Sequence, residues 1–168
     1  NISYAHIKNF NNLDQIARAK AEIMNNIVSN GTIILNADDK YFKFFNKIEK
    51  NKNLKVISFG KKNRSSNIRL LKMKKKSSKI KLVIGINNAK KTFTINQELQ
   101  PYLMNILDSI TVLSQFFNLK QISQNIFLNF KIPNARGNLF KVNINKKSIL
   151  VTDESYNSNP LSLNFAVQ

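Results

Sequence analysis

Hydrophobic residues follow helical and strand periods in turn through the first 60 positions. Residues 13–28 carry apolar side chains three or four positions apart, which predicts an amphipathic helix ended by Asn30-Gly31. A short apolar strand at 32–35 follows, then a second amphipathic helix capped by Asp38 or Asp39, then a strand at 54–60. The order helix, strand, helix, strand predicts an α/β fold with a mostly parallel sheet.

The pattern changes in the middle of the chain. Three alternating or apolar runs, at 67–73, 80–86 and 92–95, follow one another without helices between them, and Asn87-Asn88 is a plausible turn. We therefore expect an antiparallel meander attached to the parallel sheet. The lysine-rich residues 72–81 then fall on an exposed turn or strand edge, where lysine discourages pairing with other strands.

Helical periodicity returns after the meander. Residues 99–117 predict one helix and 119–130 a second, which the proline-containing run 133–137 breaks. Two strands, at 140–144 and 148–151, then predict a hairpin around Asn145-Lys146-Lys147. Pro160 begins a further amphipathic segment, which predicts a helix near the last residue.

Composition places limits on the class of protein. The 168 residues suit one ordinary domain, or one domain and a piece of another. The absence of cysteine excludes a disulfide scaffold and a thiolate zinc site, and no apolar run approaches the ~20 residues that span a bilayer. Membrane insertion is therefore not expected, and a reducing cytoplasm is the default location. Because the chain begins with Asn1, we expect it to be a fragment.

The net charge of +18 suggests a nucleic acid or another polyanion as partner. The excess is mostly lysine, which AT-rich codons encode together with the abundant Asn and Ile, so base composition alone can raise it. Arginine is scarce and tryptophan absent, although forked arginines and stacking aromatics are what specific nucleic-acid binders add. We do not expect nucleic acid to be the main partner. The alternative function is a basic α/β module that binds RNA or another polyanion through residues 61–81.

The densest group of chemically capable side chains follows the last predicted strand. Residues 152–160 hold two carboxylates, a phenol and two amides within one turn. Such a turn can be a simple Asx turn and helix cap, without function. Polar groups at the end of a buried strand also build sites in α/β proteins. The local chemistry leaves both interpretations open.

The order of the short motifs is more specific than any one of them. The motifs are Ala5-His6, Ala19-Lys20-Ala21-Glu22, Leu35-Asn36-Ala37-Asp38-Asp39, Asn105, Ala135-Arg136-Gly137, and Asp153-Glu154-Ser155-Tyr156-Asn157-Ser158-Asn159-Pro160. In this order they resemble the Mur ligases of peptidoglycan synthesis. The resemblance implies that residues 1–150 are the second part of a P-loop-type central ATP-binding domain. Residues 151–168 would begin a C-terminal Rossmann-like domain, so that the chain is truncated at both ends.

The resemblance also implies an activity. These enzymes form an amide with ATP and Mg²⁺ through an acyl phosphate, and the last motif is similar to the branch that joins D-alanyl-D-alanine to a UDP-N-acetylmuramoyl-tripeptide. A full-length monomer is expected. The run 156–160 argues against a folylpolyglutamate synthetase of the same superfamily. The sequence contains no Gly-x-x-x-x-Gly-Lys-Ser/Thr, so we expect no ATP turnover by these 168 residues alone.

Three residues are catalytic candidates by this resemblance. His6 is the sole histidine and would lie at a second magnesium ion. Lys20 matches the family lysine that is carbamylated, which turns a cation into an oxygen ligand suited to Mg²⁺. Arg136 matches the arginine that neutralises phosphate. From the residues alone, His6 and Lys20 are more often structural or solvated.

Four further residues are candidates for contact with the nucleotide. Asn36 is first a turn residue, with contact to the adenine side as a second possibility. Asn105 matches the second asparagine of a family helix motif of the form His-Asn-x-x-Asn-Ala, whose first two positions are Pro101 and Tyr102 here. An acidic residue of the interdomain motif orients the nucleotide, and either Asp153 or Glu154 can fill that place.

Overall fold

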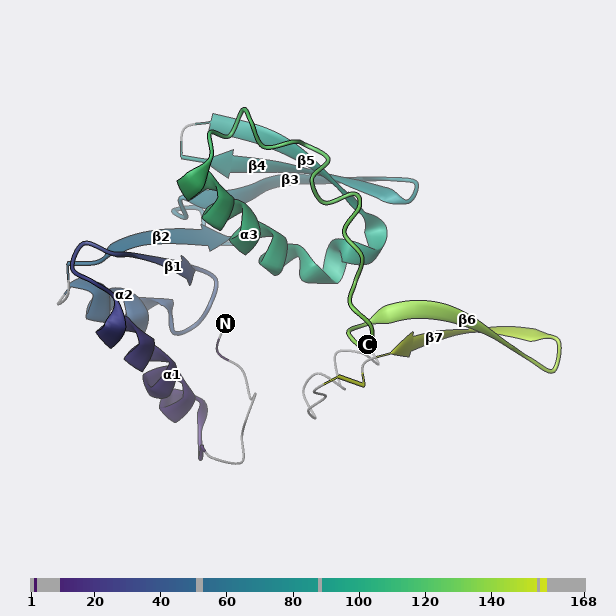
Figure 1. The fold of residues 1–168 in the computed structure, drawn as a ribbon, viewed down its shortest axis with the longest axis horizontal. Coiled ribbons are helices and arrows are strands. Elements are labelled where there is room, and N and C mark those ends of the chain that lie inside the picture. The colour runs from purple at the N-terminus through teal and green to yellow at the C-terminus, as the bar shows by residue number, and fades with distance from the viewer. Residues whose placement is uncertain (1, 3–9, 51–52, 88, 154, 157–168) are drawn as a thin grey trace.

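The computed structural model describes residues 2, 10–50, 53–87, 89–153, 155 and 156. Its elements are, in chain order, α1 (Leu13–Ala21), η2 (Glu22–Asn26), β1 (Thr32–Asn36), α2 (Phe42–Lys50), β2 (Lys55–Gly60), β3 (Ile68–Lys76), β4 (Lys79–Ile86), β5 (Ala89–Asn96), η3 (Gln97–Tyr102), α3 (Leu103–Phe116), β6 (Asn138–Ile144) and β7 (Lys147–Asp153). Figure 1 shows this arrangement. No helix in the described ranges is long and apolar enough to cross a membrane.

The predicted α/β fold with an attached meander is confirmed. The main sheet has the order β1-β2-β3-β4-β5, in which β1, β2 and β3 run parallel and β3, β4 and β5 antiparallel (Figure 1). The parallel pairing of β2 with β3 is short and covers only Phe59 with Ile68 and Gly60 with Arg69. The far half of β3 therefore leaves the parallel part of the sheet and pairs with β4 alone.

The first predicted helix is shorter than its periodic pattern. Asn12 caps α1, because its side chain accepts a hydrogen bond from the Gln15 amide at 2.9 Å. The α-helix ends at Ala21 and continues as the 3₁₀ helix η2 to Asn26, whereas the prediction extended to residue 28. Asn30, with φ of 62°, belongs to the turn before β1 and does not end the helix.

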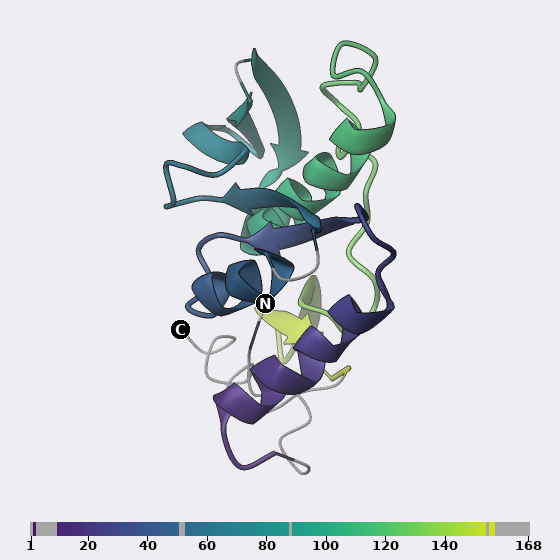
Figure 2. The same cartoon turned by 90° about the vertical axis from the view of Figure 1, so that its left-hand side faces the viewer.

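The core lies between one face of the sheet and α3 (Figures 1 and 2). Leu107 and Ile110 of α3 are fully buried against the alternating apolar positions of β4 and β5. Thr111 is buried too, and its hydroxyl donates to the Leu107 carbonyl at 2.7 Å, so this buried polar group has a hydrogen-bond partner. The fully buried sheet residues of this core are Ile68, Ile80, Leu82, Ile84, Phe93 and Ile95.

The predicted helix at 119–130 is wrong: this segment forms a series of turns. Asn118 and Ser123 accept hydrogen bonds from backbone amides two residues on, which favours turns over a helix. The segment also pairs with β5, since the Thr94 amide donates to the Gln124 carbonyl at 2.8 Å. Its apolar side chains still reach the core, and Phe127 packs edge-to-face on Phe93. Tertiary contact with the sheet thus outweighs the helical pattern.

The predicted hairpin is confirmed as β6 and β7. Asn145 and Lys146 join the strands with φ of 49° and 64°, as a two-residue turn with two positive φ values requires. β7 runs without a break through residue 150 to Asp153. The helix predicted from Pro160 lies outside the described residues.

The carboxylate of Asp38 connects two loops at the end of the parallel strands. It follows β1 and accepts hydrogen bonds from three consecutive amides after β2, at 2.6 Å from Lys61, 3.0 Å from Lys62 and 2.7 Å from Asn63. The Asp39 side chain accepts from the Tyr41 amide at 2.9 Å in the turn that leads into α2, so neither predicted residue directly precedes the helix, which begins at Phe42. Charged acceptors that hold several amides are among the stronger hydrogen-bonding groups in proteins.

We predict that Asp38→Ala lowers the free energy of unfolding by about 2 kcal/mol, because three amides lose a charged acceptor. Asp38→Asn, which keeps one oxygen, should cost about half as much. Urea unfolding followed by circular dichroism measures both. The exposed Glu98→Ala serves as control and should change stability by less than about 0.5 kcal/mol. Equal stability of Asp38→Ala and Glu98→Ala would contradict the role of Asp38.

Candidate functional site

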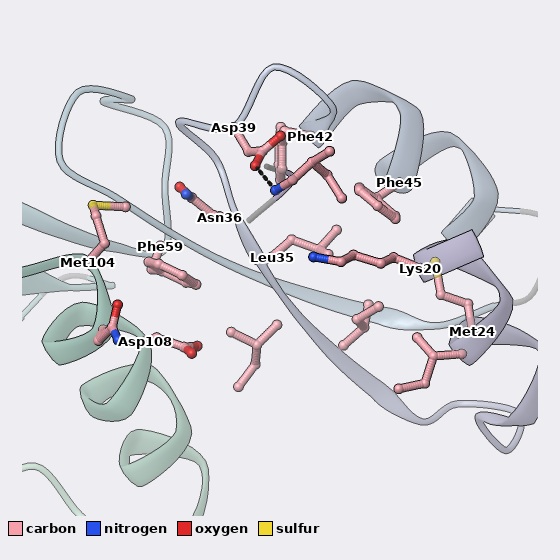
Figure 3. Close-up of a pocket in the computed structure, with 15 residues that line it drawn as sticks. Lys20, Met24, Leu35, Asn36, Asp39, Phe42, Phe45, Phe59, Met104 and Asp108 are labelled. Carbon is pink, nitrogen blue, oxygen red and sulfur yellow. Dashed lines mark hydrogen bonds between the residues drawn. The ribbon is translucent and has the colours of Figure 1, made fainter. Parts of the chain in front are cut away.

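A pocket of about 350 Å³ opens beside β1 (Figure 3). Apolar side chains from β1, β2 and α2 form much of its wall, and polar groups come from α1, α3 and the loop after β1. This combination of an apolar wall with a few polar groups is typical of small-molecule sites. Its lining residues are Ile2, Lys20, Ile23, Met24, Ile33, Ile34, Leu35, Asn36, Asp39, Phe42, Phe45, Phe59, Met104, Asn105 and Asp108.

The pocket brings together three of the residues that the sequence singled out. Lys20 comes from the last turn of α1, Asn36 from the end of β1 and Asn105 from the first turn of α3. Ile16 and Ala17 are buried and hold α1 in place, while Lys20 is exposed and extends into the pocket (Figure 3). Lys20 lies 85 positions and Asn36 lies 69 positions before Asn105 in the sequence, so the three residues reach one cavity only through the fold.

The loop after β1 is shaped by its own side chains. The Asn36 side-chain oxygen accepts from the Asp38 amide at 2.9 Å, which confirms that Asn36 is a turn residue. The second carboxylate oxygen of Asp39 accepts from the Ile2 amide at 2.8 Å, the contact dashed in Figure 3. Both side chains still line the pocket, so the turn that they stabilise also sets the pocket rim.

Asp108 lines the pocket and was not predicted. It lies three residues after Asn105 on α3, so the two side chains share one face of the helix. Although much of the residue is exposed, the burial of its carboxyl group against the pocket raises its pKa above the ordinary value. The spacing of three from Asn105 is the sequence signal that could have identified it.

Arg136 and Asp153 lie outside the pocket, at the base of the β6–β7 hairpin. The Gly137 amide donates to the Asp153 carbonyl at 2.7 Å, and the Tyr156 amide donates to the Ala135 carbonyl at 2.9 Å. These bonds place the Arg136 guanidinium over the Tyr156 ring, 4.3 Å from its centroid. The Asp153 carboxylate accepts from the Ser155 hydroxyl and amide at 2.7 and 3.1 Å, and these bonds lower its pKa.

Tyr102 joins the hairpin base to the pocket wall. Its hydroxyl donates to the Arg136 carbonyl, and it immediately precedes α3, whose first residues Met104 and Asn105 line the pocket. Tyr102 occupies a position where the Mur ligase motif has asparagine. In this chain the Tyr102 hydroxyl instead links the candidate residues at the hairpin base to those that line the pocket.

Two candidates, His6 and Glu154, lie outside the described residues. Within the part of the chain that the structure describes, no three His, Cys, Asp or Glu side chains gather as a metal cage. Asp39 and Asp108 nevertheless line the same pocket as Lys20. Oxygen donors of this kind suit Mg²⁺, which often binds through one or two carboxylates together with the phosphates of a substrate.

Comparison with known families identifies the class of protein to which this fold belongs. The Mur ligase middle domain matches residues 1–113, so the chain belongs to the Mur ligase family. It is also 27% identical over 169 residues to the UDP-N-acetylmuramoyl-tripeptide–D-alanyl-D-alanine ligase of Rickettsia prowazekii. That match covers the whole chain and 36% of the Rickettsia enzyme.

Solved structures show the same fold. MurF from Acinetobacter baumannii superposes with a TM-score of 0.78 at 20% identity, over 98% of this chain and 34% of that one. MurF from Thermotoga maritima in complex with ADP superposes with a TM-score of 0.76 at 19% identity, over 99% of this chain and 36% of that one. The chain thus spans about a third of the length of these relatives, and its fold matches the corresponding part of them.

The raised pKa of Asp108 gives a pH-dependent prediction. The folded state favours the neutral acid, so the contribution of Asp108 to stability is greatest below the ordinary pKa of 3.8 and is lost as the pH rises. Asp108→Asn stays neutral at every pH and should melt about 1–2 °C higher than the parent at pH 7, with the difference vanishing in acid.

Glu98→Gln removes one negative charge outside the pocket and controls for the change in net charge. Thermal melts at neutral and acidic pH compare the three proteins. A melting temperature of Asp108→Asn that stays above that of the parent in acid would contradict the prediction.

Proposed function

We propose that the chain is part of an ATP-dependent ligase that joins D-alanyl-D-alanine to a UDP-N-acetylmuramoyl-tripeptide in the cytoplasm. The observation that carries this proposal is the pocket, which collects Lys20, Asn36 and Asn105 from three separate elements. The name of the Rickettsia relative supports the substrate pair. Residues 1–150 would belong to the central domain of this ligase and residues 151–168 to the start of its C-terminal domain.

The pocket suits the base and sugar of a nucleotide. Phe42, Phe45 and Phe59 give it apolar and aromatic surface for a planar base. Asn36 and Asn105 lie at its polar side and can accept and donate hydrogen bonds through their amides. The volume of about 350 Å³ is in the range of small-molecule pockets.

Lys20 is proposed to act beside the phosphate groups of the nucleotide. As an ammonium it neutralises phosphate, and as a carbamate it becomes an oxygen ligand for Mg²⁺. Bound Mg²⁺ would screen the repulsion between the substrate carboxylate and the phosphates. Asp39 and Asp108 line the same pocket and, with His6, are the residues that can hold such an ion.

Arg136 is proposed to neutralise the transferring phosphoryl group. Its guanidinium is held by stacking on Tyr156, and its backbone is held by Tyr102. A fixed planar fork of donors suits the oxygens of a phosphoryl group. Asp153 or Glu154 would orient the nucleotide from the same hairpin base. The hydrogen bond from the Tyr102 hydroxyl to the Arg136 carbonyl connects the hairpin base to α3, the helix that carries Asn105.

The reaction then makes separate demands on these residues. A carboxylate oxygen of the tripeptide attacks the γ-phosphorus of ATP, and ADP leaves. The amine of D-alanyl-D-alanine then attacks the carbonyl carbon of the acyl phosphate, so that an amide forms while inorganic phosphate and a proton are released. Lys20 and Arg136 stabilise the negative charge that develops on the phosphoryl oxygens. The polar residues of the pocket and of the hairpin base position the nucleotide.

Kinetics of the natural protein that contains this chain test the proposal. We expect phosphate release that requires ATP, UDP-N-acetylmuramoyl-tripeptide and D-alanyl-D-alanine together. Lys20→Ala and Arg136→Ala should each lower kcat by about 100-fold, because each removes charge stabilisation in the transition state. Lys120→Ala removes an exposed lysine from the turn segment and should leave kcat unchanged within about two-fold.

Phosphate release that depends on a single amino acid in place of D-alanyl-D-alanine would assign the protein to a different Mur ligase. Turnover that is unaffected by Lys20→Ala, in a protein that retains its fold by circular dichroism, would contradict the proposed site.

A further inference from the structure

One face of β3, β4 and β5 gathers cations without a single acid. Residues directly opposite in an antiparallel sheet lie on the same face, so the register identifies the members. Arg69, Lys72, Lys74 and Lys76 of β3 share this face with Lys79 and Lys81 of β4 and Lys90 of β5, and we call these seven residues the basic face. The other positions on it are Val83, Gly85, Thr92, Thr94 and Asn96.

The basic face is the side of the meander opposite the core. Ile80, Leu82 and Ile84 alternate with its lysines along β4 and point to α3. All six lysines of the basic face are exposed, and Arg69 is half-buried. Between Glu49 and Glu98 the sequence has 15 Lys and Arg and no acidic residue, so no neighbouring carboxylate from the meander itself neutralises the face.

The arrangement of charge costs stability in the free protein. Lys74 is paired directly with Lys81, and Lys76 with Lys79, so like charges face each other across two strands. Such pairs are destabilising in a sheet. A negatively charged surface laid against this face would remove the repulsion and gain attraction from every lysine at once.

We propose that the basic face adsorbs to an anionic lipid surface. Lysines that project from one sheet face form a broad, shallow array, which suits a layer of headgroups more than the narrow track of a single strand of nucleic acid. The face has no aromatic side chain on which a base could stack. It has instead an exposed Leu71, which the β3 bulge places over Gly85, 3.2 Å from the position that a Cβ would take there.

Vesicle sedimentation of the chain tests this proposal. We expect binding to phosphatidylcholine vesicles that contain about 30% phosphatidylserine, and none to pure phosphatidylcholine. Binding should be lost between about 0.05 M and 0.5 M salt, because the attraction is screened. Each lysine near such a surface contributes about a five-fold increase in partitioning, so Lys74→Gln/Lys81→Gln should partition about 25-fold more weakly.

The matched control is Lys141→Gln/Lys147→Gln, which makes the same change in net charge on the exposed β6–β7 hairpin. It should weaken binding by less than about two-fold. Circular dichroism confirms folding, and loss of the Lys74–Lys81 repulsion should leave the melting temperature of the face variant equal or higher. Lys72→Gln/Lys76→Gln provides a second variant of the same face.

Three results would overturn the proposal. Equal loss of binding in the face and hairpin variants would mean that only net charge matters. Equal binding to neutral and anionic vesicles would exclude electrostatic adsorption. Binding of a single-stranded RNA of about 20 nucleotides that is tighter than binding to anionic vesicles, and that the face variants abolish, would make nucleic acid the partner.

Discussion

The packing of α3 against the sheet is the constraint on which the rest of the molecule depends. Leu107 and Ile110 are fully buried on the same face that holds Ile80, Leu82 and Phe93. This contact fixes which face of the meander is apolar, and the alternation of side chains along each strand then directs most of its lysines to the other face. It also positions the first two turns of α3, from which Asn105 and Asp108 reach the pocket. One apolar interface therefore sets both surfaces for which we propose a role.

The first turn of α3 also unites the two groups of candidate residues. Met104 and Asn105 line the pocket beside β1, while the preceding Tyr102 holds the Arg136 carbonyl at the hairpin base. Asp38 adds a second connection by bonding the loop after β1 to the loop after β2. The proposed site thus consists of loops and helix ends positioned by a buried core, as is common for sites in α/β proteins.

The sequence predicted the elements well where one local signal dominated. The apolar alternation of β4 and the Asn145-Lys146 turn are local, and both were identified. It failed at 119–130, where helical spacing was overruled by hydrogen bonds to β5, a contact that no local pattern contains. The motif order indicated Lys20, Asn36 and Asn105 but not that they line one cavity, and the pocket residue Asp108 was missed. The basic face was missed as well, because a charge run shows its face only once the strand register is known.

Hydrogen exchange tests the central claim, that the pocket beside β1 is where a nucleotide binds. The natural protein that contains this chain would be compared with and without a non-hydrolysable ATP analogue, since amides at a binding site exchange more slowly once the site is filled. We predict slower exchange in residues 36–42 and 103–108, which carry the polar side of the pocket. Protection that spares both segments while the analogue is bound would contradict the assignment of the pocket.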